Sequence, residues 1–252
     1  MQPVLQYYDF GKGVTAFSTT RRGGYSEGRF GEFNINRYCG DSPAAIARNR
    51  ALLCQVLSIS DDRLLMPHQV HGTEVATVSE TTREAQLEGV DAVMTNVIGL
   101  CIGVSTADCI PVLLYDREQR AVCAIHAGWR GTVKRIVEKA VAQMTAVYGS
   151  RPADIIAQIG PGIHVESFEV GDEVYDAFAA AGFAMEPISR RYGEKWHIDL
   201  PECNRQQLLA AGVPAASVAV SPVCTYREPE TYFSARRLGI SSGRIFTGIV
   251  MG

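Results

Sequence analysis

A cysteine and a histidine are spaced so that a β-hairpin brings their side chains together. Residues 110–115 and 121–126 are short, apolar and partly β-branched, which predicts two buried strands. The polar segment DREQR between them predicts a tight turn. A turn centred between residues 117 and 118 places Cys109 opposite His126, with Cβ atoms ~5 Å apart. A thiolate and an imidazole at that separation can share a metal ion or a proton.

A second histidine, His71, adds to this candidate centre. It ends the segment HQVH, which follows Pro67 and lies at the end of a predicted strand. Asp91 opens another predicted strand, where a buried aspartate needs a partner unless it caps a turn. Asp108 and Glu74 are candidates for moving a proton, by position alone.

A glycine-bounded turn next to His126 predicts an anion site. Residues 128–131 read GWRG, and the apolar spacing after them predicts a helix from about residue 132 to Gly149. Free backbone N–H groups at a helix start attract anions, and the guanidinium of Arg130 adds donors suited to phosphate. Because most such turns bind nothing, this signal has weight only through its position beside His126.

Six segments of the chain carry a family resemblance. They are FSTTRRGG, PHQVHGTEV, DAVMTNVIGLCIGVSTADCIPVLLYD, AIHAGWRGT, CNRQQLLAAGV and CTYREPETYFSARR. With them the chain resembles the YfiH family, whose members are described as laccase-domain or polyphenol-oxidase-like proteins and as purine nucleoside phosphorylases. The resemblance implies that His71, Cys109 and His126 bind a catalytic zinc. It also implies that the segment with Arg21 lines the active site, so Arg21 joins Arg130 as a phosphate-binding candidate.

The resemblance further implies the reaction. It points to a zinc-dependent purine nucleoside phosphorylase acting on adenosine, inosine and methylthioadenosine, with adenosine deaminase side activity. Three protein ligands leave a fourth zinc position open, as in catalytic sites. Zinc would serve deamination because it lowers the pKa of a bound water to about 7. The common deaminase signature, which pairs H-x-E with P-C-x-x-C, is absent from the chain.

Four other interpretations stay open at this point. Cys109 and His126 could be the nucleophile and base of a cysteine-type amidase or hydrolase, and the family resemblance implies cell-wall precursors as its substrates. Two histidines and a cysteine could also bind copper, as in a polyphenol oxidase. The chain has five histidines and no H-x-H pair, which weighs against a multicopper enzyme. The zinc could instead be structural in a binding module, or these side chains could be ordinary core residues.

The elements that must position these residues alternate along the chain. A cap at Ser42 before Pro43 predicts a helix start, and apolar spacing continues it to Leu57. Interleaved strands and helices predict an α+β fold in one domain over residues 1–252. The resemblance implies a single layered α/β/β/α sandwich with mixed β-sheets. The further predicted strands are 13–18, 74–79, 90–95, 155–159, 218–223 and 244–251.

The overall composition indicates which kinds of partner and which cellular compartment to expect. The 252 residues are 46% apolar and carry a formal charge of −3. The chain therefore lacks the excess of positive charge that is typical of proteins that bind nucleic acid or an anionic membrane. The N-terminal segment lacks a basic stretch followed by an apolar one, so we expect no signal peptide. Seven cysteines, an odd number with no C-x-x-C pair, indicate a reducing cytoplasm. We expect small-molecule partners, and the sequence leaves a homodimer open.

Overall fold

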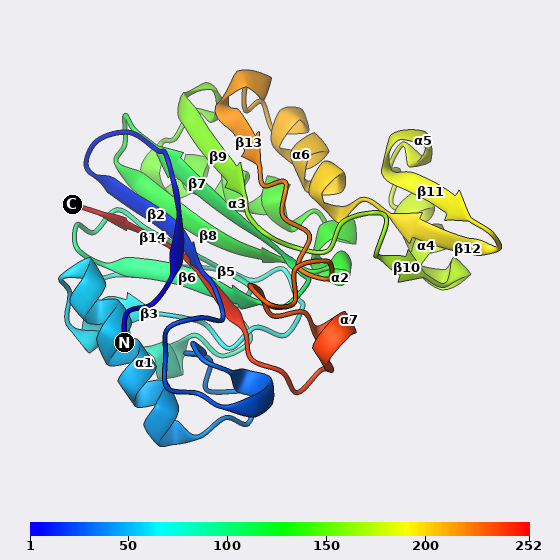
Figure 1. Ribbon diagram of the computed structural model, residues 1–252. Helices are drawn as coiled ribbons and strands as arrows, with labels where there is room; N and C mark the ends of the chain where they lie inside the picture. Colours follow the sequence, from blue (N-terminus) through cyan, green and yellow to red (C-terminus); the bar gives the residue numbers. More distant parts are fainter.

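The computed structural model describes residues 1–252, and two mixed β-sheets form its centre (Figure 1). The first sheet has five strands in the order β1-β2-β14-β6-β3. Neighbouring strands are antiparallel except for β3, which runs parallel to β6. The last strand of the chain, β14, lies between β2 and β6, so the two ends of the chain contribute neighbouring strands to this sheet. The strands are β1 Leu5–Tyr8, β2 Val14–Thr19, β14 Ile245–Met251, β6 Cys101–Thr106 and β3 Leu64–Leu65.

The second sheet has six strands in the order β13-β9-β7-β8-β5-β4. The hairpin of β7 and β8 lies at its middle, and both edge pairs are parallel. This sheet therefore holds the two strands that the sequence analysis placed next to the candidate centre. The strands are β13 Val218–Val220, β9 Ile155–Ile159, β7 Ile110–Asp116, β8 Ala121–Ala127, β5 Ala92–Thr95 and β4 Val75–Thr77.

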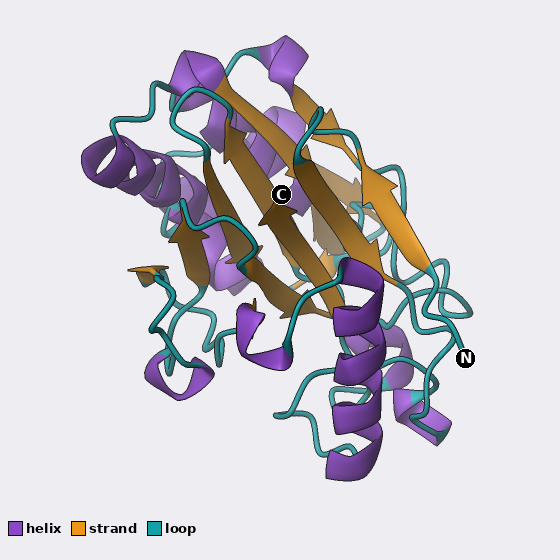
Figure 2. Cartoon of the chain, turned by 90° about the vertical axis from the view of Figure 1, so that its left-hand side faces the viewer, coloured by secondary structure: helices purple, strands orange, loops and turns teal.

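Helices cover the outer face of each sheet. The helices α3 (Ile136–Tyr148) and α6 (Leu200–Ala210) pack on the six-stranded sheet, within the largest apolar cluster. On the other side, α1 (Pro43–Leu57) packs on the five-stranded sheet. Figure 2 shows the strands at the centre of the molecule, with helices around them. The predicted α+β class and the layered α/β/β/α sandwich with mixed sheets are confirmed.

Every residue of β7 and β8 is buried, because both faces of the hairpin are covered. Val112 and Ile125 belong to the cluster beneath the helices, whereas Leu113 and Ala124 belong to the cluster between the sheets. Side chains alternate along a strand, so His126 points to the same side as Ala124. The hairpin thus delivers a histidine to the end of the layer between the two sheets.

The register of this hairpin corrects the predicted pairing. Pro111 stands opposite His126, and Asp116 stands opposite Ala121, so four residues form the turn. Cys109 precedes β7, and extending the ladder places it opposite Gly128 rather than His126. The error is two residues. Because side chains alternate with a period of two, Cys109 and His126 still lie on the same face of the hairpin.

The predicted long helix after the hairpin is two helices. The first, α2, runs from Trp129 to Val133, and α3 starts at Ile136. Arg135 between them has a left-handed backbone with φ of 63°, which ends one helix before the next begins. Arg130 therefore lies inside the first turn of α2, not in a loop ahead of a helix that starts near Thr132.

A small antiparallel sheet projects from one side of the sandwich (Figure 1). Phe168 and Val170 at its base join the largest apolar cluster, so the projection is packed onto the core. No helix of the protein is long and apolar enough to cross a membrane. The remaining elements are β10 Glu169–Val170, α4 Asp172–Ala180, α5 Met185–Ile188, β11 Ser189–Tyr192, β12 Lys195–Ile198 and α7 Ala235–Leu238.

Candidate active site

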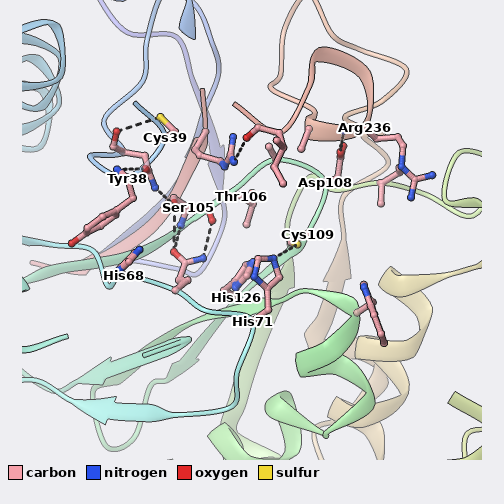
Figure 3. Close-up of a pocket in the computed structure, with 18 of the residues that line it drawn as sticks. Tyr38, Cys39, His68, His71, Ser105, Thr106, Asp108, Cys109, His126 and Arg236 are labelled. Carbon is pink, nitrogen blue, oxygen red and sulfur yellow. Dashed lines mark hydrogen bonds between the residues drawn. The ribbon is translucent and has the colours of Figure 1, made fainter. Parts of the chain in front are cut away.

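The structure brings His71, Cys109 and His126 together into one group, which we call the triad (Figure 3). Their potential ligand atoms all lie within 4.8 Å of one another. The Cys109 Sγ atom is 3.7 Å from His71 Nε2, and the two imidazole rings meet edge to face with centroids 4.8 Å apart. Two nitrogen ligands and one sulfur ligand in one small space can hold a transition-metal ion.

Three different kinds of local structure deliver the triad. His126 is the penultimate residue of β8, and Cys109 directly precedes β7. His71 lies in the turn before β4, with a left-handed backbone at φ of 60°. That conformation is uncommon for a residue with a side chain, so the surrounding structure must hold it in place.

Asp91 is the residue that holds this turn and one of the imidazoles. Its buried carboxylate accepts a hydrogen bond from His126 Nδ1 at 2.8 Å. It also accepts backbone N–H bonds from Val70, His71 and Gly72 at 3.3, 3.0 and 2.7 Å. The Nδ1 bond leaves Nε2 of His126 as the ligand atom, as in many metal-binding histidines. Both roles considered from the sequence, turn cap and buried partner, are therefore combined in one side chain.

The ionisation of the triad favours a thiolate. Burial alone would raise the pKa of Cys109, but the charge of His126 and hydrogen bonds from both histidines lower it below its ordinary value. Burial would likewise lower the pKa of His126, but the Cys109 thiolate and the Asp91 carboxylate raise it. The pKa of Asp91 is lowered, because the His126 bond and the backbone donors outweigh burial. The metal-free protein therefore favours a thiolate beside a protonated His126, and a metal ion, which binds thiolate and neutral imidazole, would displace that proton.

The space at the triad is kept open by Gly128. A Cβ atom on Gly128 would lie 2.8 Å from His71 Cδ2 and 3.0 Å from Cys109 Sγ. Real Cβ atoms do not approach so closely, so a side chain here would displace the triad. The donor set and the bare backbone beside it together fit a metal ion bound by three protein ligands.

The triad lies in the wall of a cavity of about 630 Å³. A volume of that size is typical of sites for small organic ligands. Tyr38 and His68, the aromatic edge, have stacked rings with centroids 3.9 Å apart. Arg236 and Arg244, the arginine edge, also line the cavity. The other lining residues are Asn36, Cys39, Gln69, Ser105, Thr106, Ala107, Asp108, Trp129, Ile163, Phe168, Ala235 and Ile240.

Hydrogen bonds fix the polar side chains at the aromatic edge. The Gln69 amide both accepts from the backbone N–H of Ser105 and donates to its carbonyl, each at 2.8 Å. The amide of Asn36 donates to the Ser105 hydroxyl at 2.6 Å. These groups therefore hold one orientation before any ligand arrives, which suits recognition of a polar heterocycle.

The two candidate proton carriers have different positions. Asp108 lines the cavity, and its carboxylate accepts bonds from the Thr225 hydroxyl and the Arg236 backbone N–H, both at 2.7 Å. Glu74 does not line the cavity; its backbone carbonyl accepts bonds from Asp91 and Ala92. Of the two, only Asp108 lines the cavity.

Neither Arg21 nor Arg130 lines the cavity. The Arg21 guanidinium donates to the carbonyls of Gly31 and Pro229, at 3.0 and 2.5 Å, and so ties two loops together. Arg130 is exposed, with its guanidinium 4.4 Å from the centroid of the Trp129 ring. The phosphate-binding roles expected for these two arginines stay predictions.

Four cavity-lining residues, Tyr38, Gln69, Arg236 and Arg244, have no role predicted from the sequence. A role for Gln69 was predictable, because it lies two residues before His71, in the segment that carries this candidate ligand. Arg236 lies in the segment FSARR, whose paired arginines were a usable signal for an anion site. Tyr38 and Arg244 have no distinguishing neighbours in the sequence, and only the fold brings them to the cavity.

Comparisons with known proteins agree with this architecture. The chain is 46% identical over 247 residues to the purine nucleoside phosphorylase of Bacteroides thetaiotaomicron, covering 94% of this chain and 92% of that protein. It is 46% identical over 259 residues to adenosine deaminase RL5 from an unknown prokaryotic organism, covering 97% and 98%. The crystal structure of the Bacillus licheniformis hypothetical protein YfiH matches with a TM-score of 0.95 and 30% identity, covering 99% and 97%.

A family model described as "Multi-copper polyphenol oxidoreductase laccase" matches residues 15–252. Several relatives and a solved structure that match over most of their length carry the names YfiH or YlmD. The match covers the six-stranded sheet, the five-stranded sheet apart from β1 and the first residue of β2, and all three members of the triad. The chain therefore belongs to the YfiH family.

Proposed function

We propose that this protein is a zinc-dependent purine nucleoside phosphorylase with adenosine deaminase side activity. Its substrates are adenosine, inosine and methylthioadenosine. The observation that carries the proposal is the triad in the wall of a 630 Å³ cavity. The printed names of two relatives, a purine nucleoside phosphorylase and an adenosine deaminase, support the same pair of reactions.

Zinc is the metal that the donor set supports best. His71, Cys109 and His126 would hold it, and bound zinc would act as a Lewis acid towards a ligand in its open position. The triad is the one group of metal-binding side chains in the structure, whereas multicopper oxidation needs several.

Different residues would bind the purine and act at the reaction centre. The ring faces of Tyr38 and His68 and the fixed amides of Asn36 and Gln69 suit a purine, which has flat faces and polar edges. Asp91 keeps His126 in one orientation, so the triad need not reorganise when a substrate enters. Asp108 is the carboxylate placed to move a proton at this wall of the cavity.

A cysteine-type amidase or hydrolase is the alternative with a specific observation behind it. The lowered pKa of Cys109 and the nearby His126 also describe an activated nucleophile and its acid–base partner. The names of the relatives do not favour this reaction. A covalent adduct at Cys109 with an electrophilic substrate analogue, together with activity that survives a chelator, would support the hydrolase instead.

The test is product analysis on protein of known metal content. Protein with about one zinc per chain is incubated with adenosine, inosine or methylthioadenosine, with and without phosphate. We expect free purine base only when phosphate is present, and inosine from adenosine in either case. A chelator should abolish both reactions and zinc should restore them. Full activity in metal-free protein would contradict the proposal.

The setting of this enzyme is also part of the proposal. One catalytic domain spans residues 1–252, and the enzyme works in the cytoplasm on small molecules. All seven cysteines are free, which agrees with a reducing compartment.

A further inference from the structure

We propose that Arg236 forms a binding site for a phosphate oxyanion at one end of the active-site cavity. The inference rests on the proposed function, because phosphorolysis needs inorganic phosphate beside the nucleoside. Neither arginine favoured from the sequence, Arg21 or Arg130, lines the cavity. The cations that do line it are Arg236 and Arg244.

The charges around the cavity favour an anion. Asp108 is the one carboxylate among the lining residues. Its oxygens already accept bonds from the Thr225 hydroxyl and the Arg236 backbone N–H. Neither Arg236 nor Arg244 forms an ion pair with any carboxylate of the protein, as the ion pairs of the structure all involve other residues. The two guanidinium groups outnumber the one carboxylate, so this end of the cavity carries a net positive charge.

Of the two arginines, Arg236 has the free donors. One of its terminal nitrogens, Nη1, donates to the Glu169 carbonyl at 3.0 Å, and its guanidinium lies 5.4 Å from the centroid of the Phe168 ring. Nε and Nη2 have no acceptor in the protein, and together they form a fork that matches two phosphate oxygens. In Arg244, by contrast, both terminal nitrogens donate hydrogen bonds to loop carbonyls, including that of Ile240 at 2.7 Å.

Asp108 ties this arginine to the triad. Its carboxylate holds the Arg236 backbone, and the next residue in the chain is Cys109. Figure 3 shows Arg236 beside Asp108, on the opposite side of the triad from Tyr38 and His68. A phosphate at Arg236 and a purine at the aromatic edge leave the ribose between them. That order is what an attack of phosphate on the anomeric carbon requires.

The test measures binding as well as turnover. Inorganic phosphate is titrated into zinc-loaded protein by calorimetry, and its KM is measured with inosine. Arg236→Ala should weaken phosphate binding and raise that KM by about 10–100-fold, the cost of a charge-assisted contact, and Arg236→Lys should recover part of the loss. Deamination of adenosine, which consumes water, should fall far less. The matched control is Arg237→Ala, because Arg237 is an exposed neighbour outside the cavity and should leave both values unchanged.

Two results would overturn the site: phosphate binding by Arg236→Ala as tight as by the wild type, or a larger loss in Arg21→Ala or Arg130→Ala. Wild-type protein that binds phosphate through Arg236 but releases no purine base would refute the phosphorylase and leave the site standing. A further arm titrates inosine 5′-phosphate. If Arg236→Ala weakens the binding of this nucleotide and of inorganic phosphate equally, the site recognises the phosphate oxyanion itself. If only nucleotide binding is weakened, Arg236 binds the phosphate group of a nucleotide substrate and not inorganic phosphate.

Discussion

The triad and the arginine edge share one cavity but are built in different ways. At the triad, a single buried carboxylate, Asp91, accepts four hydrogen bonds, and the two central strands beside it are covered on both faces. At the arginine edge, Arg236 extends from the four-residue helix α7 and is exposed, and Arg244 lies in the connection to β14.

This difference separates two tasks. A metal site needs its ligands fixed within a few tenths of an ångström, and buried hydrogen bonds provide that precision. A ligand that enters and leaves needs a side chain that can adjust, and an exposed arginine on a short helix provides that freedom. Changes at the triad should therefore alter metal binding and stability together, whereas changes at the arginine edge should alter ligand binding alone.

The largest effect is expected for Cys109→Ser. Removing a ligand from a set of three should weaken zinc binding by more than the roughly 10–100-fold that loss of an outer partner costs. Metal content after dialysis against a weak chelator measures this. Cys39→Ser is the matched control, since Cys39 is a thiol that lines the same cavity outside the triad. If Cys109→Ser and wild-type protein retain equal amounts of zinc, Cys109 is not a zinc ligand.

The next effect, on stability rather than on metal affinity, is expected for Asp91→Ala. It leaves the His126 ring and three backbone N–H groups without their acceptor in a buried place, which should cost about 3–5 kcal/mol of unfolding free energy. Urea unfolding of zinc-free protein measures it, and Asp91→Asn, which keeps the shape and one acceptor, should lose less. Arg236→Ala, the matched change at the arginine edge, should stay within about 0.5 kcal/mol of the wild type. Comparable losses at both places would show that the two regions do not differ in this way.

The smallest effect is a difference in pH dependence between two thiols of the cavity. In metal-free protein the pKa of Cys109 is lowered to about 6, mainly by His126 acting against burial, whereas burial raises the pKa of Cys39. The Cys109 thiolate should persist above pH 6 and disappear as the pH falls through that value; Cys39 should ionise only above the ordinary thiol range. Iodoacetamide labelling followed by peptide mass spectrometry measures both rates. Parallel pH profiles for the two cysteines would contradict the assignment, and added zinc should protect Cys109.

Much of the fold follows from local patterns in the sequence. The predicted strands at 155–159 and 244–251 agree with β9 and β14 to within one residue, and the predicted helix from Pro43 to Leu57 agrees with α1. These elements have strong local signals: a capped helix start, and apolar runs bounded by turn residues. The helix break at Arg135 was missed, because a left-handed arginine carries no local sequence signal.

For the site, the family resemblance in the sequence pointed to three side chains that could bind a metal, and the strand pattern placed two of them, Cys109 and His126, on one face of the hairpin. A two-residue error in the pairing left Cys109 and His126 on one face, because the alternation of side chains has the same period. The tertiary structure alone decided that Asp91 links His126 to the turn of His71, and that Arg236 reaches the cavity while Arg130 does not. The physical reason is range: strand and helix patterns act over a few residues, whereas these contacts join segments separated by 20 to 128 positions. Strand pairing, as between β5 and β8, and the packing of loops bring those segments together.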